Sequence, residues 1–197
     1  MPMRERSGES GLTLIELLFA VAVAILIAGM ALPVTDAALD DLHTGAAARY
    51  VAGVVLNDRM DALKRARSVA LHFEPSGPDY VFEPYVDGNG NGVRTAEIRS
   101  GVDPSIGAGQ RLSERFPGVT FGLQAGLPDA DGVRSTNTDG IRIGSARILA
   151  TAPDGTATSG TLYVQGRRAQ YAVRVLGATA RTRVMKFERG AGAWTSR

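Results

Sequence analysis

The 197-residue chain contains no cysteine and only two histidines, His43 and His72. The lack of cysteine excludes a disulfide framework, a thiolate metal site and a cysteine nucleophile. Neither histidine has a second histidine or a carboxylate at the spacing of metal ligands, and no serine can be grouped with them into a catalytic set. We therefore predict that the protein is not an enzyme and that it binds no cofactor.

A large excess of charge of one sign is also missing, since the formal net charge is +2, but the charges are unevenly distributed. Residues 36–165 hold 12 basic and 16 acidic side chains, whereas residues 166–197 hold eight basic side chains and one acid, Glu188. Such a basic segment attracts nucleic acid or an acidic neighbour, or it forms a solvated surface.

The sequence has one long apolar run, GLTLIELLFAVAVAILIAGMALP, from Gly11 to Pro33. Its length reaches the roughly 20 residues that a helix needs to cross a bilayer. Basic residues before the run and acidic residues after it predict a cytoplasmic N-terminus and an exported remainder. A cleaved secretory signal and a plain signal anchor are the alternatives. Neither explains Glu16, because a carboxylate at the bilayer centre costs about 3 kcal/mol.

The segment GLTLIE resembles the type III signal of type IV pilins and type II secretion pseudopilins. In that family a prepilin peptidase cuts after the glycine, the new N-terminus is methylated, and the fifth mature residue is glutamate. The resemblance implies a leader of residues 1–11, with cleavage and methylation at Gly11 and Leu12, and makes Glu16 that glutamate. It also implies a membrane and assembly helix over residues 12–34, and Pro33 falls where many pilins bend this helix.

Cleavage before Leu12 would create a charged amine inside the apolar layer. Glu16 can pair with the amine of an adjacent subunit, so that the two charges offset each other and set the register between subunits. The alternative is an acid that reaches the membrane surface without any partner.

Beyond the apolar run, apolar side chains recur at helical spacing, and we predict an amphipathic helix over residues 35–71 that packs on a sheet. The apolar positions are Leu39, Leu42, Ala46, Tyr50, Val54, Leu56, Met60 and Leu63. Residues 72–197 then predict a β-rich head, because short alternating segments such as RLSERF, VTFGL and TRVMKFE are separated by Pro and Gly. GTLYVQGRRAQYAVRVL predicts a hairpin, residues 124–140 a long surface loop, and Trp194 a tail anchor on the sheet.

The predicted fold is therefore α+β, with a long transmembrane-then-amphipathic helix packed on an antiparallel head. The segments ALKRARSVALHF and VDGNGNGVRTAE, the hairpin and the basic C-terminal strand resemble the GspH/FimT branch of the pilin family. The resemblance implies a minor pseudopilin of a type II secretion system, held in the bacterial inner membrane with its head in the periplasm. Its implied partners are other minor and major pseudopilins, the prepilin peptidase and the inner-membrane assembly platform.

The alternative within this branch is a FimT-type minor type IV pilin that binds DNA for transformation. Arg181 and Arg183 are the residues that match its basic motif, with Ala180 at the position of the family's glycine. Two residues apart on a strand, these arginines would point the same way toward a polyanion.

The stretch Asp87, Asn89, Asn91 begins like a calcium-binding loop. The twelfth position of an EF-hand loop, which needs a bidentate glutamate, is Ile98 here, and no helix is predicted on either side. Asp, Asn and Gly also favour turns by themselves, so we interpret the stretch as a turn and keep calcium binding as the alternative.

Overall fold

The structure is a computed structural model that describes residues 13–134 and 136–196, apart from the side chains of residues 28–34. The chain consists of two compact units, Met1–Ala38 and Leu39–Arg197. Helices and antiparallel strands make up the chain, so the α+β class is confirmed.

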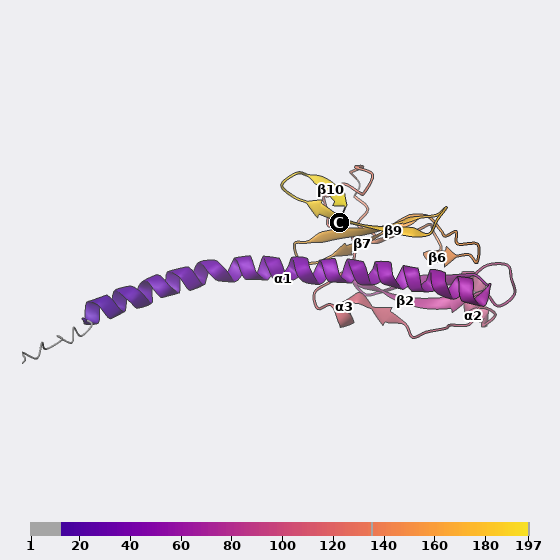
Figure 1. Ribbon diagram of the computed structural model, residues 1–197, viewed down its shortest axis with the longest axis horizontal. Coiled ribbons are helices and arrows are strands. Elements are labelled where there is room, and N and C mark those ends of the chain that lie inside the picture. The colour runs from indigo at the N-terminus through magenta and orange to yellow at the C-terminus, as the bar shows by residue number, and fades with distance from the viewer. Residues whose placement is uncertain (1–12, 135, 197) are drawn as a thin grey trace, which may run out of the picture. The chain divides into compact units, whose positions relative to one another are not determined.

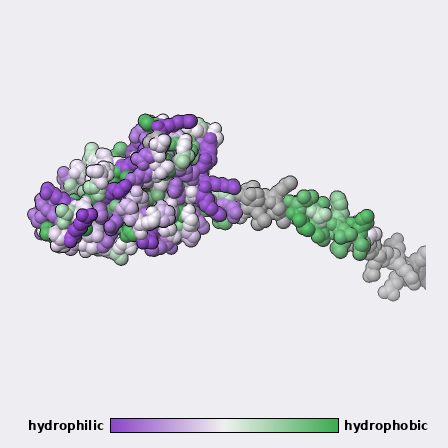
Figure 2. All heavy atoms as spheres, turned by 180° about the vertical axis from the view of Figure 1, so that it is seen from behind, coloured by the Kyte–Doolittle hydropathy of each residue, from purple (hydrophilic) through white to green (hydrophobic). Residues whose placement is uncertain are grey.

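Helix α1 covers Leu14–Arg65 and is therefore 52 residues long (Figure 1). Its part in the first unit carries exposed apolar side chains from Leu14 to Ile27, which form the green segment in Figure 2. Within the residues whose side chains the structure describes, no helix has both the length and the apolar character that are needed to cross a membrane.

The C-terminal end of α1 lies six residues before the end that we predicted at residue 71. Ala66 adopts the left-handed conformation, with φ at 49°, and Arg67 N donates to the carbonyl of Ala62. These features are those of a Schellman cap, which stops a helix. The following residues, which the prediction had included in the helix, begin strand β1 at Val69.

Four strands form the first sheet of the head, in the order β3-β2-β1-β6, with every pair antiparallel. They are β1 (Val69–Ser76), β2 (Asp79–Val86), β3 (Gln110–Arg111) and β6 (Ile148–Thr151). The second sheet has the order β10-β9-β8-β7-β4, and β5 also pairs with β7. Its strands are β4 (Thr120–Phe121), β5 (Ile141–Arg142), β7 (Gly160–Gln165), β8 (Gln170–Leu176), β9 (Arg181–Glu188) and β10 (Ala193–Ser196).

The predicted hairpin is confirmed as β7 and β8, and the described residues of 124–140 form an irregular loop as expected. Trp194 packs on the second sheet, 5.4 Å from the Phe187 ring and 5.8 Å from the Tyr163 ring, but it does so from a further strand, β10.

Two short helices in the head were not predicted. Helix α3 (Leu112–Arg115) replaces most of the strand expected for RLSERF, and its Ser113 N donates to the Asp79 carboxylate at 3.3 Å. Helix α2 (Thr95–Ser100) follows the Asp87 stretch, where we had expected no helix.

The core lies where the part of α1 that belongs to the second unit, residues 39–65, packs on both sheets (Figure 1). Small side chains of α1, among them Ala47, Ala48, Val51 and Val55, are at most 2% exposed. They contact one continuous buried cluster that includes Leu71 and Phe73 of β1, Leu162 and Val164 of β7, and Val173 of β8. Small residues let the helix approach two sheets at once.

The predicted apolar face of α1 is confirmed only in part, because Tyr50 and Val54 are half-buried against the core but five of the eight predicted positions are exposed. Leu42 is 62% exposed and Leu56 is 52% exposed, and Leu39, Met60 and Leu63 are exposed as well. The buried face instead carries alanine and valine together with three polar residues, Asp40, Thr44 and Asp58. Hydrophobic periodicity misses this arrangement because it assumes that the largest apolar side chains point inward.

Asp58 is 6% exposed, and it follows Val51 and Val55 at helical spacing along the buried face of α1. Within the described residues its Oδ2 has no hydrogen-bond partner. Burial, with a smaller contribution from the charge of Asp61, raises the pKa of Asp58 to about 7. The head therefore keeps a carboxyl group that favours the protonated state.

Asp58→Asn should stabilise the head at pH 8. The pKa of Asp58 is raised on folding, so its contribution to stability is complete below pH 4 and is lost as the pH rises through about 7. The loss is of the order of 4 kcal/mol at most, from about 1.4 kcal/mol per pKa unit. Urea unfolding of the full chain in detergent at pH 4 and pH 8 measures it. Equal free energies of unfolding for the variant and the parent at pH 8 would contradict the raised pKa.

Candidate functional site

Glu16 lies in the first turn of α1 and is exposed. Its backbone N–H donates to Thr13 Oγ1 at 3.4 Å, and the Thr13 hydroxyl donates to Glu16 Oε2 at 3.5 Å. The first contact is the threonine half of a capping box, whereas in the second the glutamate meets the threonine hydroxyl and not its backbone N–H. The structure thus gives Glu16 a local role that the sequence analysis did not consider, beside the predicted pairing with another subunit.

The other predicted residues of this segment are only partly covered by the structure. Gly11 and Leu12 lie outside the described residues. Pro33 lies within α1, which continues as a helix on both sides of it, and its side chain is not among those described. The bend at Pro33 therefore stays a prediction.

The Asp87 stretch forms a turn held by backbone donors. Asp87 is 3% exposed, and its carboxylate accepts the N–H groups of Asn89, Gly90 and Gly92 at 2.7 to 3.1 Å. Burial would raise the pKa of Asp87, but these donors hold it below its usual value. The carboxylate of Asp103 accepts the N–H groups of residues 88 and 94 and so closes the loop.

Calcium binding at this stretch would need the carboxylate oxygens of Asp87, but both of them accept backbone N–H groups. Asn89 and Asn91 also bond locally, through Asn91 N to Asn89 Oδ1 and through Asn91 Nδ2 to Glu97 Oε1. In the part of the chain that the structure describes, no three His, Cys, Asp or Glu side chains are placed to hold a metal ion.

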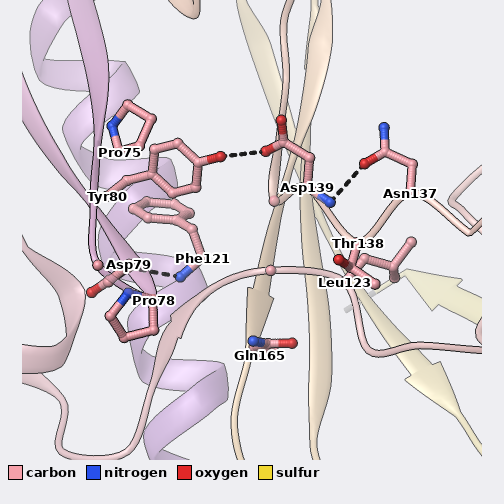
Figure 3. A pocket seen from close by; sticks show the side chains of 13 residues that line it. Pro75, Pro78, Asp79, Tyr80, Phe121, Leu123, Asn137, Thr138, Asp139 and Gln165 are labelled. Atoms are coloured by element: carbon pink, nitrogen blue, oxygen red, sulfur yellow. Dashed lines mark hydrogen bonds between the residues drawn. The ribbon is translucent and has the colours of Figure 1, made fainter.

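A cleft of about 430 Å³ opens between the turn of the β1–β2 hairpin and the segment before β5 (Figure 3). Two of its polar groups bond to each other, since the Tyr80 hydroxyl donates to Asp139 Oδ1 at 2.6 Å. Arg147, which does not line the cleft, donates to Asp139 Oδ2 at 3.0 Å. Burial, assisted by Asp139, raises the pKa of Tyr80 to about 12, so its hydroxyl stays protonated. The arrangement fixes the two sheets locally and supplies no activated nucleophile.

The best-organised polar site joins α1 to the hairpin turn between β7 and β8. Asp40 is 7% exposed, and its carboxylate accepts the backbone N–H groups of Arg167, Arg168 and Ala169, each at 2.8 Å. Burial alone would raise the pKa of Asp40, but the three donors and the charge of Arg167 lower it below the usual value. The residue before the turn, Gly166, packs against Asp40 so closely that any side chain would collide with it.

Asp41 supports the same junction one residue along the helix. Its carboxylate accepts the Tyr171 hydroxyl at 3.0 Å and pairs with Lys186 Nζ at 2.9 Å. Gly45 lies one turn further on, and a Cβ there would be 3.0 Å from the Tyr171 hydroxyl. Sequence reasoning missed this site because its acceptors and donors are more than 120 residues apart in the chain.

Arg181 and Arg183 are both exposed on β9 and lie on the same face of the second sheet, as predicted from their spacing. Ala180 before them is buried in the left-handed conformation, with φ at 48°, which favours glycine over alanine. A glycine would fit this position without strain. DNA binding by the two arginines stays a prediction.

Gly166→Ala should lower the free energy of unfolding by about 1 to 3 kcal/mol, because the added Cβ would collide with Asp40 and Thr44. Gly190→Ala is the matched control, since its Cβ would enter open space. Denaturant unfolding of the full chain in detergent compares the two variants. The close packing at the turn is contradicted if both variants unfold at the same concentration as the parent.

Asp40→Asn should cost about 1 to 3 kcal/mol at pH 7, because an amide group cannot accept all three N–H donors. The folded pKa of Asp40 is lowered, so its stabilisation is present above pH 4 and is lost as the pH falls below that value. The melting temperature of this variant should therefore fall less steeply between pH 7 and pH 3 than that of the parent. Asp36→Asn, at an exposed position, is the control. If the melting temperature of Asp40→Asn falls as steeply with pH as that of the parent, the lowered pKa of Asp40 is contradicted.

Comparison with known proteins identifies no relative of this chain. No family model matches the chain, and no curated protein and no solved structure matches it significantly.

Proposed function

We propose that this chain is a minor pseudopilin of the GspH/FimT-like branch, a subunit of the short periplasmic fibre of a type II secretion system. In this proposal the prepilin peptidase cuts between Gly11 and Leu12 on the cytoplasmic side. Residues 12–34 then anchor the subunit once in the inner membrane, with the head in the periplasm. The assembly platform extracts the subunit into the fibre, where it meets other minor and major pseudopilins.

The observation that carries the proposal is the uncovered apolar part of α1. Between Leu14 and Ile27 the large apolar side chains are 38 to 78% exposed, while the helix further on is built into the core of the head. Each Å² of apolar surface left in water costs about 25 cal/mol, so this segment needs lipid or other subunits around it. A helix that serves first as an anchor and then as part of a fibre meets both needs.

A second apolar surface of α1 supports assembly. In the head unit, exposed apolar side chains of α1 lie in two groups, Leu39 with Leu42 and, further along the helix, Leu56 with Met60 and Leu63. Exposed apolar surface of this kind marks contact with other proteins. Gly53 lies between the two groups with open space where a Cβ would stand, and a glycine there costs the isolated helix about 1 kcal/mol relative to alanine.

The role of Glu16 separates assembly from simple anchoring. As a partner of a neighbouring N-terminal amine, it must carry a charge. As the third residue of a capping box, it needs only a hydrogen-bonding side chain, and glutamine serves equally well. The two roles therefore respond differently to Glu16→Gln.

Glu16→Val and Glu16→Gln should both leave peptidase cleavage intact and both block incorporation into fibres, because each removes the charge. Mass spectrometry of the membrane fraction measures cleavage, and immunoblots of sheared fibres measure incorporation. Gly11→Trp is the control for processing and should remain uncut. Normal incorporation of Glu16→Gln would assign Glu16 to helix capping and remove the pairing from the proposal.

A further inference from the structure

Three arginines lie together where two turns of the second sheet meet. Arg167 and Arg168 belong to the turn between β7 and β8, and Arg189 begins the turn between β9 and β10. The Arg189 guanidinium donates to the backbone carbonyl of Arg168 at 3.0 Å, so the two turns are in contact. All three residues are exposed. Together they form the basic end of the head.

The acids close to the basic end are already bonded to other groups. Asp40 lies behind the turn, and its carboxylate accepts three backbone N–H groups. Asp41 and Glu188 lie 2.9 and 3.8 Å from Lys186 Nζ. Among the residues that the structure describes, no carboxylate forms an ion pair with any of the three arginines. The basic end therefore presents three guanidinium groups to an anion from outside the chain.

The turn that carries two of these arginines has a fixed backbone. The N–H groups of Arg167 and Arg168 each donate to Asp40 at 2.8 Å, and Gly166 before them packs closely against the same carboxylate. An anion that binds their side chains does not have to order the backbone first, which removes part of the entropy cost of association.

The basic end is also close in the chain to the long apolar run. Asp40 follows Pro33, the last residue of that run, by seven residues. Seven residues span at most about 25 Å even when fully extended. Because the turn is bonded directly to Asp40, the basic end can reach the surface of a membrane that holds the apolar run, however the two units are arranged.

We infer that the basic end binds the phosphate groups of anionic phospholipids at the surface of the membrane that holds residues 12–34. This inference rests on the proposed function, which places those residues in the bilayer. The planar guanidinium group donates two parallel N–H groups to the oxygens of a phosphate. Each arginine at an anionic bilayer favours the bound state by about fivefold. The head is thus held against the membrane until the subunit is extracted into the fibre.

The position of the basic end in the chain favours lipid over nucleic acid as its ligand. Arg181 and Arg183, which match the DNA-binding motif, lie toward the other end of β9 from Arg189. A duplex at the basic end would lie beside the same anionic bilayer, whose charge repels it. Soluble phosphate esters share the chemistry of the lipid headgroup, and the experiment has to separate the two.

A fluorophore beside the basic end tests the inference in the full chain. The chain has no cysteine, so Gly190→Cys gives a single labelling position, and a Cβ there meets no other atom within 4 Å. The labelled chain is placed in nanodiscs that carry a nitroxide quencher on a fraction of the lipid headgroups. Quenching should be at least about threefold stronger in discs that contain phosphatidylglycerol than in discs of phosphatidylcholine alone.

Two double variants identify the groups responsible. Arg167→Gln with Arg168→Gln should reduce quenching to the level in phosphatidylcholine, because these side chains supply two of the three charges. Arg181→Gln with Arg183→Gln, an equal change of charge on the same sheet, should leave quenching as in the parent. Glycerol phosphate added in solution should not reduce quenching, because it lacks the bilayer that brings many headgroups to the arginines at once.

The outcomes separate this inference from the proposed function. Size-exclusion chromatography first shows whether the chain has entered the discs, and its absence from them would overturn the proposed function together with the inference. If the chain enters the discs but is quenched equally with both lipids, the inference alone is overturned. Equal loss of quenching in the two double variants also contradicts it, and loss on addition of glycerol phosphate would assign the arginines to soluble phosphate esters instead.

Discussion

The head depends on one buried carboxylate. Asp40 of α1 accepts three backbone N–H groups of the turn between β7 and β8 and so fixes the central hairpin of the second sheet against the helix. The turn closes a buried hairpin, and its donors would otherwise lose their bonds to water without replacement. Gly166 allows the approach, and the contacts of Asp41 with Tyr171 of β8 and Lys186 of β9 extend it to one further strand.

This junction explains why the helix turns its small residues inward. With Asp40 held at the turn, the face that meets both sheets carries Ala47, Val51 and Val55, and the leucines of the opposite face stay uncovered. The same helix therefore stabilises the head and presents apolar surface, both here and between Leu14 and Ile27. That combination is unfavourable for an isolated subunit and useful for one that leaves a membrane to enter a fibre.

Local features of the fold could be predicted from the sequence, while its long-range contacts could not. The hairpin of β7 and β8 follows from alternation around a Gly-containing turn, and Trp194 packs on the sheet as its size suggests. The buried face of α1 could not be found, because burial of Asp40 depends on donors 127 to 129 residues away. Helix α3 was missed for a similar reason, since its bond from Ser113 goes to Asp79 of β2. The strand register also aligns Arg142, Arg174 and Arg183 across the second sheet, and no local pattern in the sequence predicts that alignment.

The central functional claim is that the chain matures into an anchored assembly subunit with a free amine close to Glu16. Intact mass and N-terminal sequencing of the protein purified from membranes test it most directly. A chain that begins with N-methylated Leu12 agrees with the claim. A chain that still begins at Met1, or one cut beyond the apolar segment, contradicts it, because no amine would then lie within reach of a neighbouring Glu16.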